Sequence, residues 1–271
     1  MVDMNKALGL YDDVKGDMKF FVNSDVRSKI LLSLREKPKD LPILRSELDF
    51  SSSTILHGIY QLEDKNFVFK NSGHYYLSQM GELAAIKLVN LMKSFSSMNK
   101  LESLFLNHEI EVIPLHLLEG IDNLEQGQII ESKLQNLMGS HKAISDRILN
   151  SKEIRLISSV FFPEYMDLLK DPDSLKRNVN LIMTDNVCDI LLNQYMDDLH
   201  NLDNSKINIW KIDDPLKLSF AMADEFIALG LFLENGVYDS NRFLISEGNE
   251  SLAWGNKLFN HYLDQATEFK L

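Results

Sequence analysis

The sequence has little cysteine: Cys188 is the one thiol among 271 residues. A single cysteine excludes an internal disulfide and a zinc site built from several thiolates. We expect Cys188 to be a small apolar group within a helix rather than a reactive thiol. Because free thiols are typical of a reducing compartment, we predict a cytoplasmic location.

Long apolar segments are missing as well. No run of about 18 apolar residues occurs, so we expect no membrane span and no membrane partner. The first twenty residues, MVDMNKALGLYDDVKGDMKF, lack the apolar core and the small-residue cleavage site of a signal peptide. We therefore expect no leader.

Common catalytic and metal-binding motifs are also absent. There is no GxSxG, P-loop or GxGxxG, and the seven histidines form no HxxxH or HExxH pair. His108 and His116, eight positions apart, are a weak ligand set and are expected on the surface. We predict no catalytic residue, no metal site and no cofactor. An enzyme acting on a small metabolite stays open as an alternative, because adjacent acids follow predicted strands at 213–214 and 224–225.

Positive charge is scarce: the net charge is −12, which argues against loose nucleic-acid binding by the chain as a whole. The negative charge is distributed unevenly, since residues 1–112 carry a net charge of −1 and residues 113–271 carry −11. The first part of the chain can therefore present a local basic face to phosphates.

The pattern of the first part predicts a winged helix. A helical lead over 3–21 is followed by helices predicted over 24–34, 41–48 and 51–64, with Ser24 and either Ser51 or Ser52 as N-caps. Two β-prone runs, 67–70 and 75–78, then flank a glycine-containing turn. Three short helices and a hairpin are the order of this fold, in which the third helix enters the major groove and the hairpin lies beside the DNA backbone.

The third helix carries the residues predicted to contact DNA. Its hydroxyl, imidazole and amide groups can bond phosphates or base edges, and they belong to Ser51, Ser52, Ser53, Thr54, His57 and Gln61. Cationic phosphate contacts are expected from Arg45, Lys65, Lys70 and His74. The helix itself contains no Arg or Lys, although Arg to guanine is the commonest specific contact. A winged helix used for protein contact therefore remains the alternative.

A long helix is predicted next, over 81–106, with an apolar stripe. We expect it to connect two domains and to help form a homodimer, because operators often contain two half-sites. The alternative is packing within one chain. The predicted domains are a DNA-binding domain at 1–79, a connecting and dimerisation helix at 80–112, and a regulatory domain at 113–271.

The second half predicts an α/β domain with a mixed sheet. Strands are expected at 154–160, 178–184, 206–212, 219–222, 226–232 and 243–246, and helices at 123–150, 163–170, 186–199 and 250–266. Strand ends of such a sheet can present polar groups to a small-molecule effector. The predicted effector residues are Ser158, Ser159, Thr184, Asp185, Trp210 and Asp224. The overall prediction is a multidomain α+β protein.

Several stretches resemble a known family. They are RILNSKEIRLISSVFFPEY, VNLIMTDNVCDILL, INIWKIDDPLKLSFAMADEFIALGLFLENGVYDSNRFLISE and SLAWGNKLFNHYLDQA, with IYQLEDKNFVFKNSGHYYLSQMGELA in the N-terminal half. The chain resembles the archaeal winged-helix regulators that carry the methanogenesis regulatory middle domain. This resemblance implies transcription regulation, double-stranded DNA as partner, and an effector-sensing second domain. A phospholipase D-like fold for that domain, as in related sugar-sensing regulators, would be an inactive version, because the HxK…D pattern is absent.

The sequence therefore predicts a dimeric DNA-binding regulator that responds to an unknown small molecule. The alternative is a protein-interaction adaptor that retains a winged helix without DNA binding.

Overall fold

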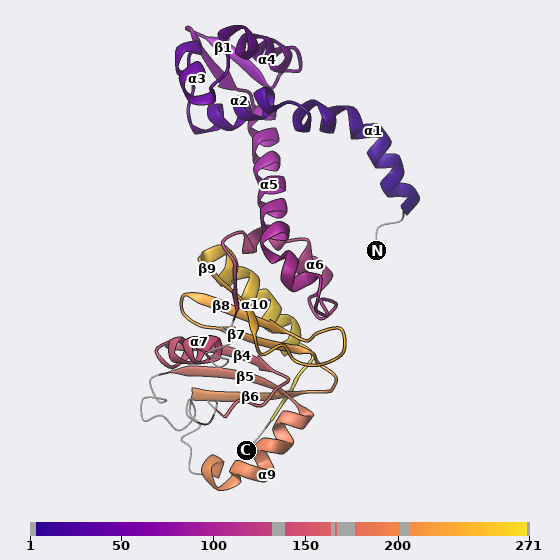
Figure 1. Ribbon diagram of the computed structural model, residues 1–271, viewed down its shortest axis with the longest axis vertical. Helices are drawn as coiled ribbons and strands as arrows, with labels where there is room; N and C mark the ends of the chain where they lie inside the picture. Colours follow the sequence, from indigo (N-terminus) through magenta and orange to yellow (C-terminus); the bar gives the residue numbers. More distant parts are fainter. Residues whose placement is uncertain (1–3, 132–138, 164–165, 167–176, 201–205, 270–271) are drawn as a thin grey trace. The chain divides into compact units, whose positions relative to one another are not determined.

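A computed structural model describes residues 4–131, 139–163, 166, 177–200 and 206–269 (Figure 1). The chain forms two compact units, Met1–Met92 and Lys93–Leu271. Helix α5 (Gln79–Phe105) begins in the first unit and ends in the second. No described helix is long and apolar enough to cross a membrane.

The N-terminal unit has the predicted order of helices and hairpin. It comprises α1 (Met4–Val22), α2 (Asp25–Glu36), α3 (Leu41–Leu48), α4 (Ser52–Asp64), β1 (Val68–Asn71), β2 (His74–Leu77) and the first part of α5. The two strands pair antiparallel, with Val68 opposite Leu77 and Asn71 opposite His74. The prediction of three helices followed by a wing is confirmed.

Side-chain caps fix where these helices begin. The side chains of Ser24, Asp40 and Ser51 each accept a hydrogen bond from a backbone N–H three residues further on. Each bond satisfies one of the amide groups that a helix N-terminus leaves unpaired. Between α3 and α4, Asp49 has a φ of 55°, a left-handed conformation that ends α3 and reverses the chain direction.

The apolar faces of these helices form the core of the unit. Side chains at helical spacing on α2 and α4 meet Leu44 of α3 and the inner faces of the hairpin. The buried residues are Ile30, Leu31, Leu34, Leu44, Ile55, Ile59, Leu62, Val68, Tyr75 and Ala85. Helical spacing of the apolar residues in α2 and α4 accounts for six of these ten positions.

Lys39 is an unexpected member of the interior. It is 1% exposed, and its Nζ lies 2.6 Å from Glu47 Oε2 and 2.9 Å from Glu36 Oε2. Burial alone lowers the pKa of Lys39, but the hydrogen bonds and charges of Glu47 and Glu36 outweigh it and raise that pKa above its usual value. The ammonium group thus stays charged and joins α2 to α3, while its backbone pairs with Tyr75 of β2.

The C-terminal unit is built on an eight-stranded mixed sheet with the order β10-β6-β5-β4-β7-β8-β9-β3. The neighbours β4, β5 and β6 run parallel, and the other pairs are antiparallel. Its strands are β3 (Gln128–Glu131), β4 (Glu153–Ser158), β5 (Asn178–Thr184), β6 (Ile207–Ile212), β7 (Leu218–Met222), β8 (Phe226–Leu231), β9 (Arg242–Glu247) and β10 (Thr267–Glu268). The predicted mixed α/β fold is confirmed.

Helices cover both faces of this sheet. One core joins α7 (Gly139–Leu149) and α9 (Asp185–His200) to the sheet. The opposite core joins the sheet to α6 (Leu115–Leu118), η1 (Ile121–Leu124), α10 (Asn249–Leu263) and the end of α5 (Figure 1). Trp254 lies in this second core, and its indole N–H donates to the carbonyl of Leu117 at 2.9 Å.

Three sequence predictions need correction or fall outside the described structure. The helix predicted over 123–150 is wrong in its first part, because Gln128–Glu131 is an edge strand that pairs with β9, whereas Gly139–Leu149 forms α7 as predicted. Its partner lies far along the chain, so local periodicity does not reveal the pairing. Of the helix predicted over 163–170, most residues lie outside the described part. His108, expected at the surface, is buried, with Nε2 3.1 Å from Asp239 Oδ2.

Close packing at Gly255 gives a test of the C-terminal core. A Cβ at this position of α10 would lie 2.6 Å from Ile227 Cγ2 and 3.0 Å from Phe220 Cζ. We predict that Gly255→Ala lowers the free energy of unfolding of this unit by about 1–3 kcal/mol through overpacking. Urea unfolding followed by the fluorescence of Trp210 and Trp254 measures it.

The matched control is Gly16→Ala on α1, where no atom lies within 4 Å of the added Cβ. The control should leave the same unfolding curve unchanged. A Gly255→Ala midpoint equal to that of the unaltered protein would contradict this account of the core.

Candidate nucleic-acid interface

The first turn of α4 presents a cluster of hydroxyl groups. Ser51 Oγ accepts from the N–H of Thr54 at 3.2 Å and lies 2.9 Å from Ser53 Oγ and 2.8 Å from Thr54 Oγ1. Ser51, Ser53 and Thr54 are exposed, and Ser52 is partly buried. The structure therefore brings these four predicted residues together at a helix N-terminus, whose amide groups and dipole favour an anion such as a phosphate.

One turn further along, His57 and Gln61 lie side by side. His57 is exposed, and its Nε2 is 3.1 Å from Gln61 Nε2. Gln61 is partly buried, and its Oε1 accepts from Arg27 Nη1 at 2.6 Å. The second bond fixes the amide of Gln61 on the inner edge of α4, so His57 is the better placed of the two to reach a ligand.

The four predicted cationic residues have different surroundings. Arg45 of α3 and Lys70 of β1 are exposed, and Lys70 Nζ lies 5.1 Å from the ring centre of Tyr75. His74, at the tip of the hairpin, is exposed as well, with Nδ1 3.3 Å from the carbonyl oxygen of Ser72. Lys65 instead forms an ion pair with Asp17 of α1 at 2.9 Å, so its charge is partly neutralised within the unit.

Two exposed apolar side chains of α4 were not predicted as functional. Leu56 and Tyr60 are 43% and 68% exposed. Both lie outside the buried stripe of Ile55, Ile59 and Leu62. Their positions relative to that helical stripe could have identified them as surface residues from the sequence. They widen the exposed surface of α4 beyond its hydroxyl groups, with apolar contacts suited to a thymine methyl group or to a protein.

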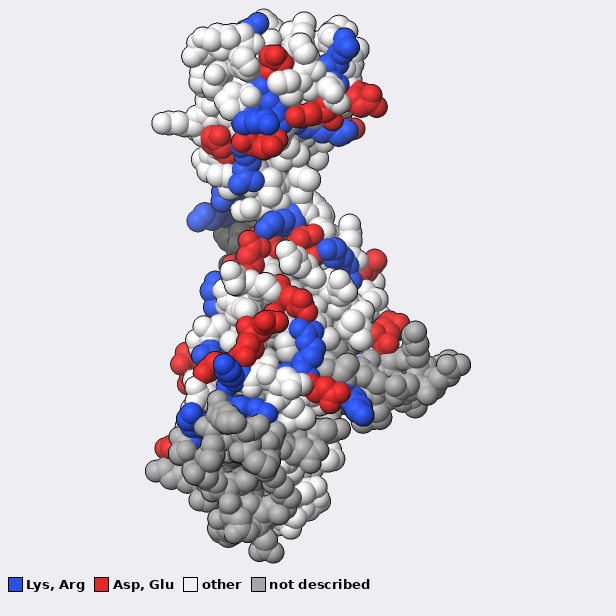
Figure 2. All heavy atoms as spheres, turned by 90° about the vertical axis from the view of Figure 1, so that its left-hand side faces the viewer, with Lys and Arg blue, Asp and Glu red and all other residues white. Residues whose placement is uncertain are grey.

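Charges of both signs are interspersed on the N-terminal unit. On the face drawn in Figure 2, Lys and Arg side chains lie next to Asp and Glu side chains. A mixed surface of this kind binds a polyanion weakly unless polar groups add specific contacts.

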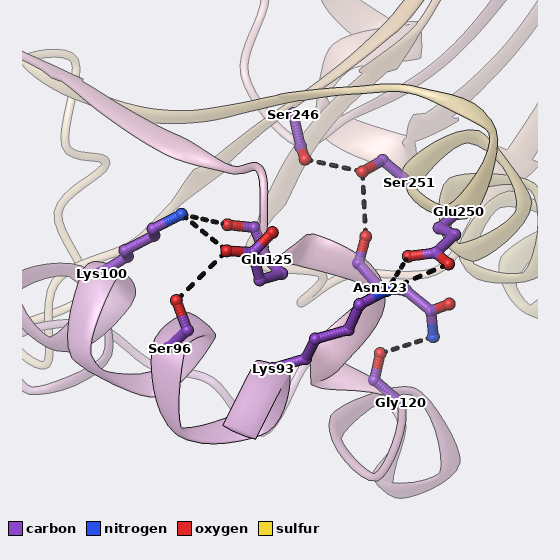
Figure 3. A network of polar contacts seen from close by, with 9 residues as sticks. All are labelled: Lys93, Ser96, Lys100, Gly120, Asn123, Glu125, Ser246, Glu250 and Ser251. Carbon is purple, nitrogen blue, oxygen red and sulfur yellow. Dashed lines mark hydrogen bonds and ion pairs between the residues drawn. The ribbon is translucent and has the colours of Figure 1, made fainter. Parts of the chain in front are cut away.

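A second polar network holds the C-terminal half of α5 within the C-terminal unit (Figure 3). Lys93 Nζ lies 3.0 Å from Glu250 Oε2 at the start of α10. Lys100 Nζ lies 3.2 Å from Glu125 Oε1 and also donates to the backbone carbonyl of Glu125, while Ser96 Oγ donates to the same carboxylate. Sequence patterns gave no sign of these pairs, whose partners lie far apart along the chain.

The network continues through hydroxyl groups into the sheet. Ser251 Oγ donates to the carbonyl of Asn123 at 3.0 Å and lies 2.7 Å from Ser246 Oγ of β9 (Figure 3). The hydrogen bond and the positive charge of Lys100 lower the pKa of Glu125, so this carboxylate is ionised at neutral pH. Helix α5 is joined to α10 through Glu250, and through Glu125 to the segment that precedes the edge strand β3.

The predicted effector residues do not form one cluster. Ser158 and Thr184 end the parallel strands β4 and β5, and Asp185 begins α9 beside them. Asp224 lies at the opposite end of β4, where its carboxylate accepts from the N–H groups of Lys152 and Glu153 at the start of that strand. The grouping of Asp224 with the other residues is therefore not supported, because β7 runs antiparallel to β4.

The remaining effector residues are mostly engaged in the fold. Ser159 Oγ donates to the carbonyl of Leu218 at 2.9 Å, and Trp210 packs partly buried against the second core. Lys211 Nζ lies 2.8 Å from Asp185 Oδ1. Thr184 is fully buried, and its hydroxyl has no hydrogen-bond partner among the described residues.

A cavity of about 350 Å³ lies beside Asp224, at the end of the sheet where β4 begins. It is lined by Asp146, Arg147, Asn150, Ser151, Asp224, Glu225 and Phe226. Its lining is mainly polar, and Arg147 stacks over Phe226 with its guanidinium carbon 3.9 Å from the ring centre. Asp224 thus belongs to a separate cavity from the groups at the carboxyl ends of β4 and β5.

Neither a metal site nor a reactive thiol emerges from the described residues. No group of three His, Cys, Asp or Glu side chains in the described ranges is placed to hold a metal ion. Cys188 is buried within α9, and burial raises the pKa of its thiol to about 11. A protonated, buried thiol is a poor nucleophile.

Comparisons with solved structures give distant likenesses. The archaeal chromatin protein TrmBL2, described as showing a novel mode of DNA binding, has a TM-score of 0.42 and 14% identity, covering 90% of this chain and 94% of that one. An IclR transcriptional regulator from Alicyclobacillus acidocaldarius has a TM-score of 0.23 and 11% identity, covering 89% and 95%. TM-scores this low do not establish a shared fold.

Sequence comparisons are more specific. The chain is 25% identical over 261 residues to the methanogenesis regulatory protein FilR1 of Methanothrix harundinacea (strain 6Ac), covering 94% of this chain. It spans 58% of the length of that relative. Two family models also match, the N-terminal domain of methanogenesis regulatory protein FilR1 over residues 15–96 and its middle domain over residues 138–265. The chain therefore belongs to the FilR1 methanogenesis regulatory protein family.

Proposed function

We propose that this protein is a DNA-binding transcriptional regulator whose C-terminal unit senses an effector. The observation that carries the proposal is the exposed polar surface of α4, the third helix of a winged-helix arrangement, beside a hairpin with exposed cationic side chains. Membership of a regulatory protein family supports the same function. No enzymatic activity is part of the proposal.

Recognition of the DNA sequence is assigned to α4. Ser53, Thr54 and His57 are exposed on its N-terminal half, where a recognition helix contacts base edges. Hydroxyl and imidazole groups bond such edges with less geometric restriction than a bidentate arginine. Phosphate contacts come from Arg45 and from Lys70 and His74 in the wing, so α4 and the wing divide the two tasks.

Binding to an operator is proposed to involve a homodimer. Helix α5 contributes exposed apolar side chains that are available for such contacts, namely Met80, Leu83, Ile86, Leu91, Met92, Phe95 and Met98. Two-fold symmetry of the protein would match two half-sites in the DNA.

The effector-sensing role rests on the C-terminal unit and on its connection to α5. The buried hydroxyl of Thr184 at the end of β5 is a polar group suited to orient a ligand, with Ser158 and Asp185 beside it. An effector changes DNA affinity only if it binds two states of the protein with different affinities. The pairs Lys93–Glu250 and Lys100–Glu125 are where such a change would reach α5. A phospholipase D-like fold for this unit stays a prediction.

An adaptor without DNA binding is the second candidate. The exposed Leu56 and Tyr60 on α4, together with the lack of Arg and Lys in that helix, favour it. DNA affinity that is absent or independent of salt would support the adaptor over the regulator.

Negative charge on α4 should weaken DNA binding strongly. In the double variant Ser53→Glu, His57→Glu, two carboxylates would face the phosphates, and we expect affinity for the preferred fragment to fall at least about 100-fold. Fluorescence anisotropy with labelled DNA measures it. Asn99→Glu on α5, an exposed position in the second unit, is the control and should change affinity little. Equal affinity of the double variant and the control would exclude α4 as the contact surface.

Removal of two cations should change the salt dependence. Arg45→Ala with Lys70→Ala removes two expected phosphate contacts, and each contact contributes about 0.9 to the slope of log affinity against log salt. We predict a slope shallower by about two units for each bound protomer, or about four for a homodimer, with the sequence preference retained. An unchanged slope would remove both side chains from the interface.

Loss of the ion pairs Lys93–Glu250 and Lys100–Glu125 should lower the local stability of the C-terminal end of α5. Lys93→Met with Lys100→Met breaks both ion pairs but keeps side chains of similar length, so amide hydrogen exchange over residues 93–105 should accelerate. Lys87→Met, on the exposed N-terminal part of the same helix, is the control. Exchange that stays equal in the two variants would show that buried Leu101 and Leu104 suffice to hold the helix.

A further inference from the structure

Helix α1 has an apolar stripe that faces away from its own unit. Residues 4, 8, 11, 15, 18 and 22 follow one another in alternating steps of four and three. This spacing places them within a sector of about 80° on an α-helix. Except for Lys15 the stripe is apolar, and Met4, Leu8, Tyr11, Met18 and Val22 are each at least 49% exposed.

Other residues attach α1 to the rest of the N-terminal unit. The rings of Phe20 and Phe21 lie 6.3 and 4.9 Å from the ring of Phe67, measured between centres. Asp17 forms the ion pair with Lys65. These contacts lie near the C-terminal end of α1, and no residue of the helix is buried. The stripe therefore has no partner among the described residues of the unit.

We propose that this stripe is a self-association surface, on which α1 of a second copy of the chain packs antiparallel. Alternating steps of four and three are the repeat of a two-stranded coiled coil, whose apolar seam is complementary to a like seam. A helix with so few contacts of its own is marginal in water, and pairing would bury its apolar side.

Lys15 selects the orientation of the pair. In a parallel pair, this seam position would face its own copy, and two ammonium groups would meet. In an antiparallel pair with Leu8 opposite the partner's Met18, Lys15 lies opposite the partner's Tyr11, where a cation can stack on an aromatic ring. Lys15 already has Asp12 of its own helix 2.9 Å away, which partly neutralises its charge. An antiparallel pair also has the two-fold symmetry of a closed dimer.

The size of the surface sets the strength of the contact. The five apolar side chains bury roughly 500 Å² per copy, or about 1,000 Å² in total, which is near the lower limit for a specific interface. The α1 pair is therefore a weak contact that adds to others. The pair would hold two winged helices about one axis. Its role in DNA binding rests on the proposed function, whereas the pairing itself does not.

Sedimentation of the full chain tests the surface. We expect Leu8→Lys to raise the dimer dissociation constant at least about tenfold, because it places a charge in the apolar seam. Leu10→Lys is the matched control: Leu10 is 62% exposed on the same helix but outside the stripe, and its substitution should change the constant little. Lys15→Leu should tighten the dimer. A constant that Leu8→Lys leaves unchanged would overturn the proposal without affecting the assignment of DNA contacts to α4.

Disulfide trapping tests the orientation. In a Cys188→Ala background, the double variant Leu8→Cys, Met18→Cys should oxidise to a covalent dimer, because positions 8 and 18 of opposite copies are neighbours in the antiparallel pair. Either single variant should remain uncrosslinked, since like positions then lie about 15 Å apart along the axis. Rapid crosslinking of Leu8→Cys alone would show a parallel pair and overturn the proposed orientation. No crosslinking of the double variant would overturn the pair itself.

Discussion

Burial of the central strands on both faces is the constraint on which the C-terminal unit depends. In β4 and β5, Ile154 and Val179 point into one core, whereas Ile157 and Ile182 point into the other. Parallel strands of this kind require helices on each side. One of the two covering layers includes the end of α5, through Leu101 and Leu104. The helix that leaves the winged-helix unit is therefore part of the second core, and the polar network of Figure 3 fixes it further.

In the N-terminal unit, the residues that form the core and the exposed residues proposed to contact DNA overlap little. The inner side of α4 fills the core through Ile55 and Ile59, and Arg27 holds Gln61 at its edge. Its outer side carries hydroxyls, an imidazole and two apolar side chains, with no cation. Because charges of both signs are interspersed on this unit, the proposed DNA binding would depend on short-range contacts and on the use of two copies more than on long-range attraction.

Local patterns predicted the longer helices, the hairpin and most strands, because capping and apolar periodicity are short-range signals, but they missed the short helices α6 and η1. They failed wherever the outcome depends on distant partners. The strand at 128–131 exists only through β9, and the interior position of Lys39 depends on two glutamates from different helices. The position of Asp224 follows from the direction of β7, which a list of strands does not give. The N-cap of α4 brings together the four residues predicted at its start, and their contact with DNA stays a prediction.

Genomic-fragment selection with the purified full chain at two salt concentrations shows whether this protein recognises DNA through α4. We expect recovery of a limited set of fragments that share an inverted repeat, with weaker recovery at the higher salt concentration. The Ser53→Glu, His57→Glu variant should recover none of them. Recovery of no fragment at low salt, or the same recovery by that variant, would rule out DNA recognition through α4.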